Sequence, residues 1–112
     1  MTKVYAPHLI IIRESLAAID QYRPADKAAF LADAIVRDAV LMRLQVIGEH
    51  LSRMRHIDEE RFAEIADPTW YQVIGLRNVI SHGYEKIDPE RIWHIISAEL
   101  PALENSLDVF NQ

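Results

Sequence analysis

Apolar residues recur along this chain at steps of three and four positions, the spacing of one face of an α-helix. No stretch alternates apolar and polar residues between turn-forming pairs, so the pattern carries no signal for β-strands. We predict that the first helix ends before Arg23-Pro24, because the residue before a proline disfavours helical geometry. Its apolar stripe consists of Tyr5, Leu9, Ile12, Leu16 and Ile19.

A second, longer helix is predicted from the cap residue Asp26 to about Met54. Its apolar residues lie on more than one side, so most of its circumference must be covered. We therefore expect this helix at the centre of a small bundle, at the seam of a dimer, or both. Gly48 has no side chain, which allows another backbone to approach there. The two stripes are Phe30, Ala34, Leu41, Leu44, Gly48 and Leu51, and Val36, Val40 and Ile47.

Two further helices are predicted in the middle of the chain. Asp58-Glu59-Glu60 indicates a short one, because acidic side chains suit the positive end of the helix dipole. Asp67-Pro68 indicates the next, since proline is well tolerated in the first helical turn. It is expected to run from Thr69 to about Ser81, and Gly83 is a natural stop.

The last helix begins with a similar signal, Asp88-Pro89-Glu90, and contains Pro101, which should bend or loosen it. Four main helices and one short helix, joined by short turns, predict an all-α antiparallel bundle. The length of 112 residues fits a single domain over residues 1–112. The final apolar stripe consists of Trp93, Ile96, Leu100, Leu103, Leu107 and Phe110.

Composition excludes several kinds of site. The chain has no cysteine, which rules out disulfides, thiolate metal sites and cysteine nucleophiles. No two of its five histidines lie three or four positions apart, so no helical metal pair is predicted. The longest apolar run, Leu9-Ile10-Ile11-Ile12, is too short to span a bilayer, and the start lacks a signal-peptide pattern. We expect a cytoplasmic protein without a membrane segment.

Charge is distributed unevenly along the chain. The formal net charge is −5, whereas phosphate binding normally uses a basic surface. Residues 37–56 contain four arginines against two acidic residues, and residues 85–112 contain two basic and six acidic residues. A solvated helix face is the simpler interpretation of the basic segment. The alternative is a rim that guides RNA, formed by Arg43, Arg53 and Arg55.

Polar side chains that could take part in catalysis cluster at the end of the predicted helix 69–81. Arg77 and Ser81 share one face of an ideal helix, and Asn78 and His82 share another. Arg77 and His82 are about 140° apart, so they do not meet as helical neighbours. Two routes could bring them to one substrate. The helix could unwind at Gly83, or a two-fold dimer could place this helix end beside its own copy.

These groups suit the cleavage of RNA. A ribose 2′-hydroxyl attacking the adjacent phosphate must lose a proton, and the leaving 5′-oxygen must gain one. A histidine can serve either step, and an arginine can bind the phosphoryl oxygens as negative charge builds. The simpler interpretation makes His82 a helix cap, Arg77 an ion-pair partner and Tyr84 a packing residue.

The sequence Arg77-x4-His82-x-Tyr84 resembles the R-x4-6-H-x-Y signature of the HepT-like (HEPN) toxins. The surrounding segment 75–84, followed by Ile87-Asp88, is similar to the same family, as is Leu44-Gln45-Val46-Ile47-Gly48-Glu49. Ile92-Trp93 and Leu100-Pro101 are similar to its last helix. The resemblance extends from about residue 30 to residue 104.

The resemblance implies a homodimeric HEPN bundle that acts as a metal-independent RNase toxin without a cofactor, with tRNA among its substrates. Arg77 and His82 would form the catalytic pair across the dimer seam. A nucleotidyltransferase antitoxin of a type VII-like pair would transfer AMP from ATP onto Tyr84. Asn78, Glu49 and Ser81 would have supporting roles. Asn78 would orient His82, and Glu49 would pair with Arg77 or remain an exposed acid.

Two rival hypotheses remain at this stage. In the first, the bundle is a non-catalytic, nucleotide-binding or regulatory subunit of the nucleotidyltransferase, and the motif holds a nucleotide phosphate. In the second, it is a plain interaction module whose motif is accidental. An RNA-cleavage assay separates the enzyme from both.

Overall fold

The computed structural model describes residues 4–111, and no β-strand occurs among them. The main helices are α1 (Ala6–Tyr22), α3 (Ala34–Ile57) and α5 (Pro68–His82), with shorter helices α2 (Lys27–Ala32), α4 (Glu59–Ile65), α6 (Pro89–His94) and α7 (Leu100–Ser106). A 3-10 turn, η1 (Tyr84–Lys86), follows α5. A π-helical segment, η2 (Ile95–Glu99), joins α6 to α7, and a 3-10 segment, η3 (Leu107–Asn111), ends the described chain.

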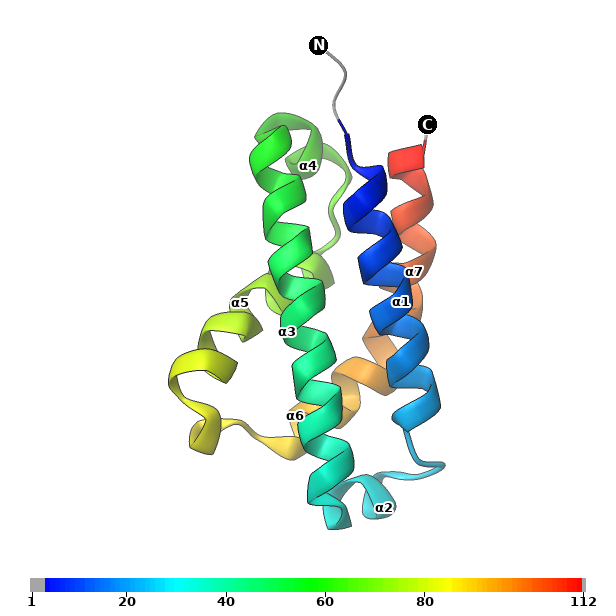
Figure 1. Cartoon of the computed structure of the whole chain (residues 1–112), viewed down its shortest axis with the longest axis vertical. Coiled ribbons are helices and arrows are strands. Elements are labelled where there is room, and N and C mark those ends of the chain that lie inside the picture. Colours follow the sequence, from blue (N-terminus) through cyan, green and yellow to red (C-terminus); the bar gives the residue numbers. More distant parts are fainter. Residues whose placement is uncertain (1–3, 112) are drawn as a thin grey trace.

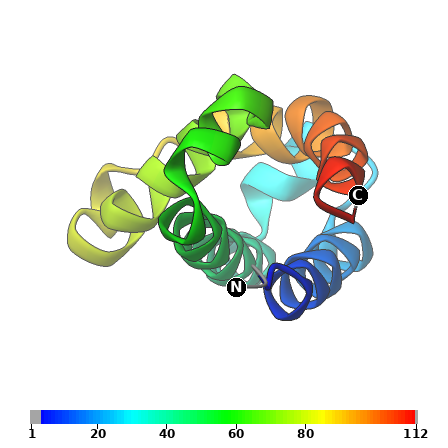
Figure 2. The same cartoon turned by 90° about the horizontal axis from the view of Figure 1, so that it is seen from above.

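The helices form an all-α bundle, as the periodicity predicted. α1 runs antiparallel to α3 and to α7, which flank it (Figure 1). Seen from above, the helices surround the core, and α5 projects sideways from it (Figure 2). α3 packs against α1 on one side and α5 on the other, so it occupies the central position that its many apolar sides predicted. No helix within residues 4–111 is long and apolar enough to cross a membrane.

The predicted helix from Asp26 to Met54 is wrong in one respect, because it is two helices. Asp33 is extended, with φ −116° and ψ 97°, and separates α2 from α3. Its carboxylate accepts hydrogen bonds of 3.1 Å from the backbone N–H groups of Ile35 and Val36. A short acidic side chain competes with helical hydrogen bonding in this way and favours a new start. The guanidinium of Arg37 donates to the carbonyl oxygens that end α2.

The other predicted helix starts are confirmed, whereas α3 ends at Ile57 and not near Met54. α1 ends at Tyr22, before the proline, and the carboxylates of Asp26, Asp58, Asp67 and Asp88 each accept a backbone N–H at a helix start. Pro101 does loosen the last helix. Proline has no N–H to donate to the carbonyl one turn back, and the π-helical segment η2 lies immediately before α7.

The core lies between α1, α3, α5 and the C-terminal helices. Trp70 is fully buried, donates its indole N–H to the Ser106 hydroxyl at 2.8 Å and stacks on Phe110 with ring centroids 5.1 Å apart. This anchors the start of α5 to the C-terminal end of the bundle. The motif residues at the C-terminal end of α5 are therefore carried on a helix whose N-terminal end is anchored.

Candidate active site

Gly48 permits the contact that positions α5. A Cβ atom added at Gly48 would lie 2.6 Å from the carbonyl oxygen of Val73 and 3.4 Å from the Cβ of Arg77. The predicted close approach of another backbone at Gly48 is therefore confirmed, and that backbone belongs to α5. Because Arg77 follows Val73 by four residues, it lies on the same face of α5 and meets α3 one turn further along.

Arg77 is held by Glu49 across this contact. Its Nη1 donates to Glu49 Oε2 at 2.8 Å, and the other carboxylate oxygen of Glu49 accepts a hydrogen bond of 3.2 Å from Arg53. The hydrogen bond from Arg77 lowers the pKa of Glu49, so this carboxylate is ionised at neutral pH. The Nε of Arg77 is buried and has no hydrogen-bond partner within residues 4–111. Of the guanidinium nitrogens, only Nη1 has a hydrogen-bond partner among the described residues.

The pair lies in a cleft of about 520 Å³ between α3 and α5. Gln45 spans the cleft and donates to the Ser81 hydroxyl at 2.9 Å. Three residues of the predicted site, Arg77, Asn78 and Ser81, line the cleft from α5, and Glu49 lines it from α3. Its remaining lining residues are Met42, Val46 and His50.

His82 does not line this cleft. It is the last residue of α5 and is exposed, and Gly83 ends the helix with its N–H donating to Val79 at 2.8 Å. The helix does not unwind to carry His82 round to Arg77 in this structure. No hydrogen bond in the described part of the chain joins Asn78 to His82, so the expected orientation of His82 by Asn78 is not formed here.

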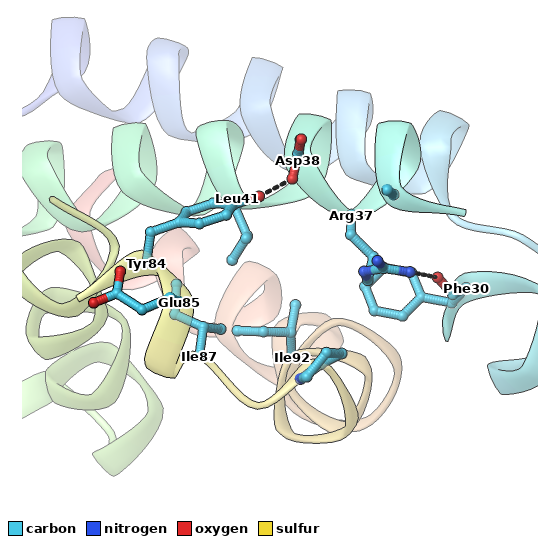
Figure 3. Close-up of a pocket in the computed structure, with 10 residues that line it drawn as sticks. Phe30, Arg37, Asp38, Leu41, Tyr84, Glu85, Ile87 and Ile92 are labelled. Carbon is cyan, nitrogen blue, oxygen red and sulfur yellow. Dashed lines mark hydrogen bonds between the residues drawn. The ribbon is translucent and has the colours of Figure 1, made fainter. Parts of the chain in front are cut away.

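Tyr84 lies in a different place from Arg77. Its ring reaches from η1 toward α3, where its hydroxyl donates a hydrogen bond to Asp38 (Figure 3). It lines a separate pocket of about 350 Å³ that shares no lining residue with the Arg77 cleft. A group added to Tyr84 would therefore lie outside the Arg77 cleft of the same chain. The pocket residues are Phe30, Ala34, Arg37, Asp38, Leu41, Tyr84, Glu85, Ile87, Pro89 and Ile92.

The three arginines expected at an RNA rim differ in exposure and lie outside the cleft lining. Arg53 is exposed and bound to Glu49, whereas Arg43 and Arg55 are half-buried, and none of them lines the cleft. No group of three or more His, Asp or Glu side chains within the described residues could hold a metal ion.

Sequence reasoning missed two histidines at this site. His50 lines the cleft, and its Nδ1 lies 2.9 Å from the Nδ1 of His8 on α1. Burial lowers the pKa of both imidazoles, and the nearby Arg53 lowers both further. The place of His50 directly after Glu49 was a usable signal. The contact with His8 was not visible, because 42 positions separate the two residues.

The family model and the relatives that match this chain point to the same family. Residues 12–110 match the HepT-like family, described as Ribonuclease HepT-like. A protein named Putative RNase MJ1380, from Methanocaldococcus jannaschii, is 25% identical over 99 residues, which cover 88% of each chain. Probable ribonuclease HepT from Thermococcus cleftensis is 23% identical over 96% of each chain. Putative RNase TTE0752 from Caldanaerobacter subterraneus is 24% identical over 87% of this chain and 84% of its own. No solved structure matches.

Proposed function

Because the chain belongs to the Ribonuclease HepT-like family, we propose that it cleaves RNA without a metal or cofactor, using Arg77 and His82. The observation that carries this proposal is the state of Arg77. Its side chain is 27% exposed in a cleft, its Nη1 is bound by an ionised carboxylate, and its Nη2 has no hydrogen-bond partner within residues 4–111. A guanidinium fixed in this way is suited to bind a phosphate.

In the proposed reaction the ribose 2′-oxygen attacks the adjacent phosphorus and loses its proton. A new O–P bond forms, the bond to the 5′-oxygen breaks, and that oxygen gains a proton. The products are a 2′,3′-cyclic phosphate and a 5′-hydroxyl. Arg77 stabilises the negative charge on the phosphoryl oxygens, and the imidazole of His82 transfers a proton. DNA has no 2′-hydroxyl and would not react.

The proposed site is complete only when two copies meet. Within one chain His82 lies outside the Arg77 cleft, so a second copy is required to bring the His82 imidazole to the same phosphate. Exposed large apolar side chains on α1, α3 and α5 support such a contact. Met42 on the cleft wall is 60% exposed, Ile10 on α1 is 59% exposed and Val79 on α5 is 43% exposed.

We further propose that the chain is the toxin of a toxin–antitoxin pair and that tRNA is among its substrates. A nucleotidyltransferase antitoxin would use Tyr84. The phenol oxygen attacks the α-phosphorus of ATP, a new O–P bond forms, pyrophosphate leaves and the phenol loses its proton. The Tyr84 side chain is 48% exposed, so it is accessible to such an enzyme. The added phosphodiester would lie beside the acidic Asp38 and repel it.

The test compares RNA cleavage by the purified chain with cleavage by Arg77→Ala and His82→Ala, in the presence of a metal chelator. We expect wild type to cut and both variants to lose at least about 100-fold in rate. If wild type and both variants leave RNA equally intact, the enzyme assignment fails. Binding of AMP without RNA cleavage would favour a nucleotide-binding subunit instead, because the pocket of about 350 Å³ beside Tyr84 is large enough for a base.

A further inference from the structure

The Arg77 cleft contains a histidine that the RNase motif does not include. His50 lines the cleft together with Arg77, Asn78 and Ser81, whereas His82 of the same protomer does not. Its ring is half-buried between α1 and α3, at the contact with His8. A titratable group therefore lies at the edge of the cleft in which the phosphate would bind.

The reaction requires two proton transfers, one from the 2′-hydroxyl and one to the leaving 5′-oxygen. A single imidazole cannot occupy both sides of the phosphorus in one step. We propose that His50 is the general base of this cleft, and that His82 from a second copy protonates the leaving oxygen. This inference rests on the proposed RNase function and adds a catalytic residue to it.

His8 acts as a positioning residue for His50. The two Nδ1 atoms are 2.9 Å apart, and the ring planes are tilted by 46° with centroids 5.2 Å apart. One Nδ1 must carry the hydrogen that the other accepts. In our assignment His50 donates, so that its Nε2 retains a lone pair for the 2′-hydroxyl proton. The hydrogen bond to His8 then fixes both the tautomer and the ring orientation.

The charges around His50 favour the unprotonated form that a base requires. Burial lowers its pKa most, and positive charge on His8 or Arg53 lowers it further, whereas Glu49 alone acts in the opposite direction. Arg77 lines the same cleft from α5, where it is paired with Glu49. At neutral pH the imidazole is therefore neutral and able to accept a proton.

The experiment uses two RNA substrates with His50→Ala, His82→Ala and the control His56→Ala. One substrate has the ordinary linkage, and in the other a sulfur replaces the bridging 5′-oxygen. Thiolate leaves without a proton, so the second substrate needs a base but no acid. His56 is exposed on the same helix as His50, lies outside the cleft and receives the same substitution. Thermal melting of each variant checks that the fold is retained.

On the ordinary RNA we expect losses of about 100-fold or more for His50→Ala and His82→Ala, and none for His56→Ala. On the sulfur substrate, activity should return for His82→Ala but stay low for His50→Ala. A folded His50→Ala that cleaves ordinary RNA like wild type would overturn this inference alone, as would recovery of His50→Ala on the sulfur substrate. If the wild type leaves RNA intact, the proposed RNase function is wrong as well.

Two substitutions at position 8 test the positioning role. Gln can accept the Nδ1–H hydrogen bond of His50, whereas Phe only fills space. We expect His8→Phe to lower the cleavage rate and to change the acidic limb of the pH–rate profile, which reports the base, while His8→Gln restores much of the rate. Equal rates and pH profiles for wild type and a folded His8→Phe would refute the role of His8.

Discussion

Gly48 of α3 lies so close to α5 that a methyl group at this position would meet the carbonyl oxygen of Val73 at 2.6 Å. This contact positions Glu49 and Arg77, which form the ion pair of the cleft. Glu49 is the next residue on α3, and Arg77 is one turn beyond Val73 on α5, so the close approach brings their charged groups to 2.8 Å. The geometry of the cleft therefore depends on the absence of one side chain.

Replacing Gly48 with alanine should destabilise the protein by about 1–3 kcal/mol, the usual cost of an overpacked contact. The clash is with backbone, which cannot move aside as a flexible side chain would. Gly75→Ala is the matched control, because a Cβ there meets no atom within 4 Å. Helix propensity predicts a gain of about 0.5–1 kcal/mol for the control. Urea unfolding measures both, and an unchanged midpoint for Gly48→Ala would contradict the close contact.

Glu49→Gln tests the ion pair with Arg77 through its pH dependence. The folded-state pKa of Glu49 is lowered, mainly by the hydrogen bond from Arg77. Its contribution to stability is therefore complete above the ordinary glutamate pKa of about 4.3 and is lost as pH falls through the folded value. The Glu49 side chain is 42% exposed, so the effect at neutral pH should be no more than about 1 kcal/mol.

We expect the difference in unfolding free energy between wild type and Glu49→Gln to be constant from pH 6 to 8, because Glu49 is ionised throughout this range. The difference should shrink in acid. Chemical denaturation at several pH values measures it. Glu14→Gln serves as a control, since the exposed Glu14 makes no hydrogen bond or ion pair within residues 4–111. A difference that grows as pH falls would show that the pair does not stabilise the fold.

Mixing two inactive variants tests whether the site is shared between copies. If Arg77 and His82 from different protomers act on one phosphate, Arg77→Ala and His82→Ala should complement each other after re-association. About half of the dimers would then be mixed, and each would retain one intact Arg77 and one intact His82. RNA cleavage by the mixture measures this, with each variant alone as control. Complementation that never exceeds the separate variants would place the site within one chain.

Tyr84→Phe separates packing from modification at the second pocket. The ring stays, but the hydroxyl that donates to Asp38 is lost, so stability should fall by about 0.5–1.5 kcal/mol. RNA cleavage by the unmodified chain should persist, because Tyr84 lies outside the Arg77 cleft. Mass spectrometry after incubation with ATP and the nucleotidyltransferase should show an added AMP on wild type only. Equal labelling of both proteins would exclude Tyr84 as the acceptor.

Helix boundaries and fold class could be predicted from the sequence because their causes are local. A cap such as Asp67 accepts a hydrogen bond from a residue two positions away, and Pro101 acts on the turn before it. The break at Asp33 escaped prediction for a related reason. Its side chain can either cap a new helix or face solvent within a longer one, and an apolar stripe continues past it in both cases.

The sequence by itself determined the all-α class, most helix starts, the signature Arg77-x4-His82-x-Tyr84 and the family to which they point. Only the tertiary structure decided which side chains lie in contact. It joined Arg77 to Glu49, Tyr84 to Asp38 and His8 to His50, pairs that are 28, 46 and 42 positions apart. The physical reason is that helical periodicity fixes the face a residue occupies, whereas the packing of one helix on another fixes what that face meets.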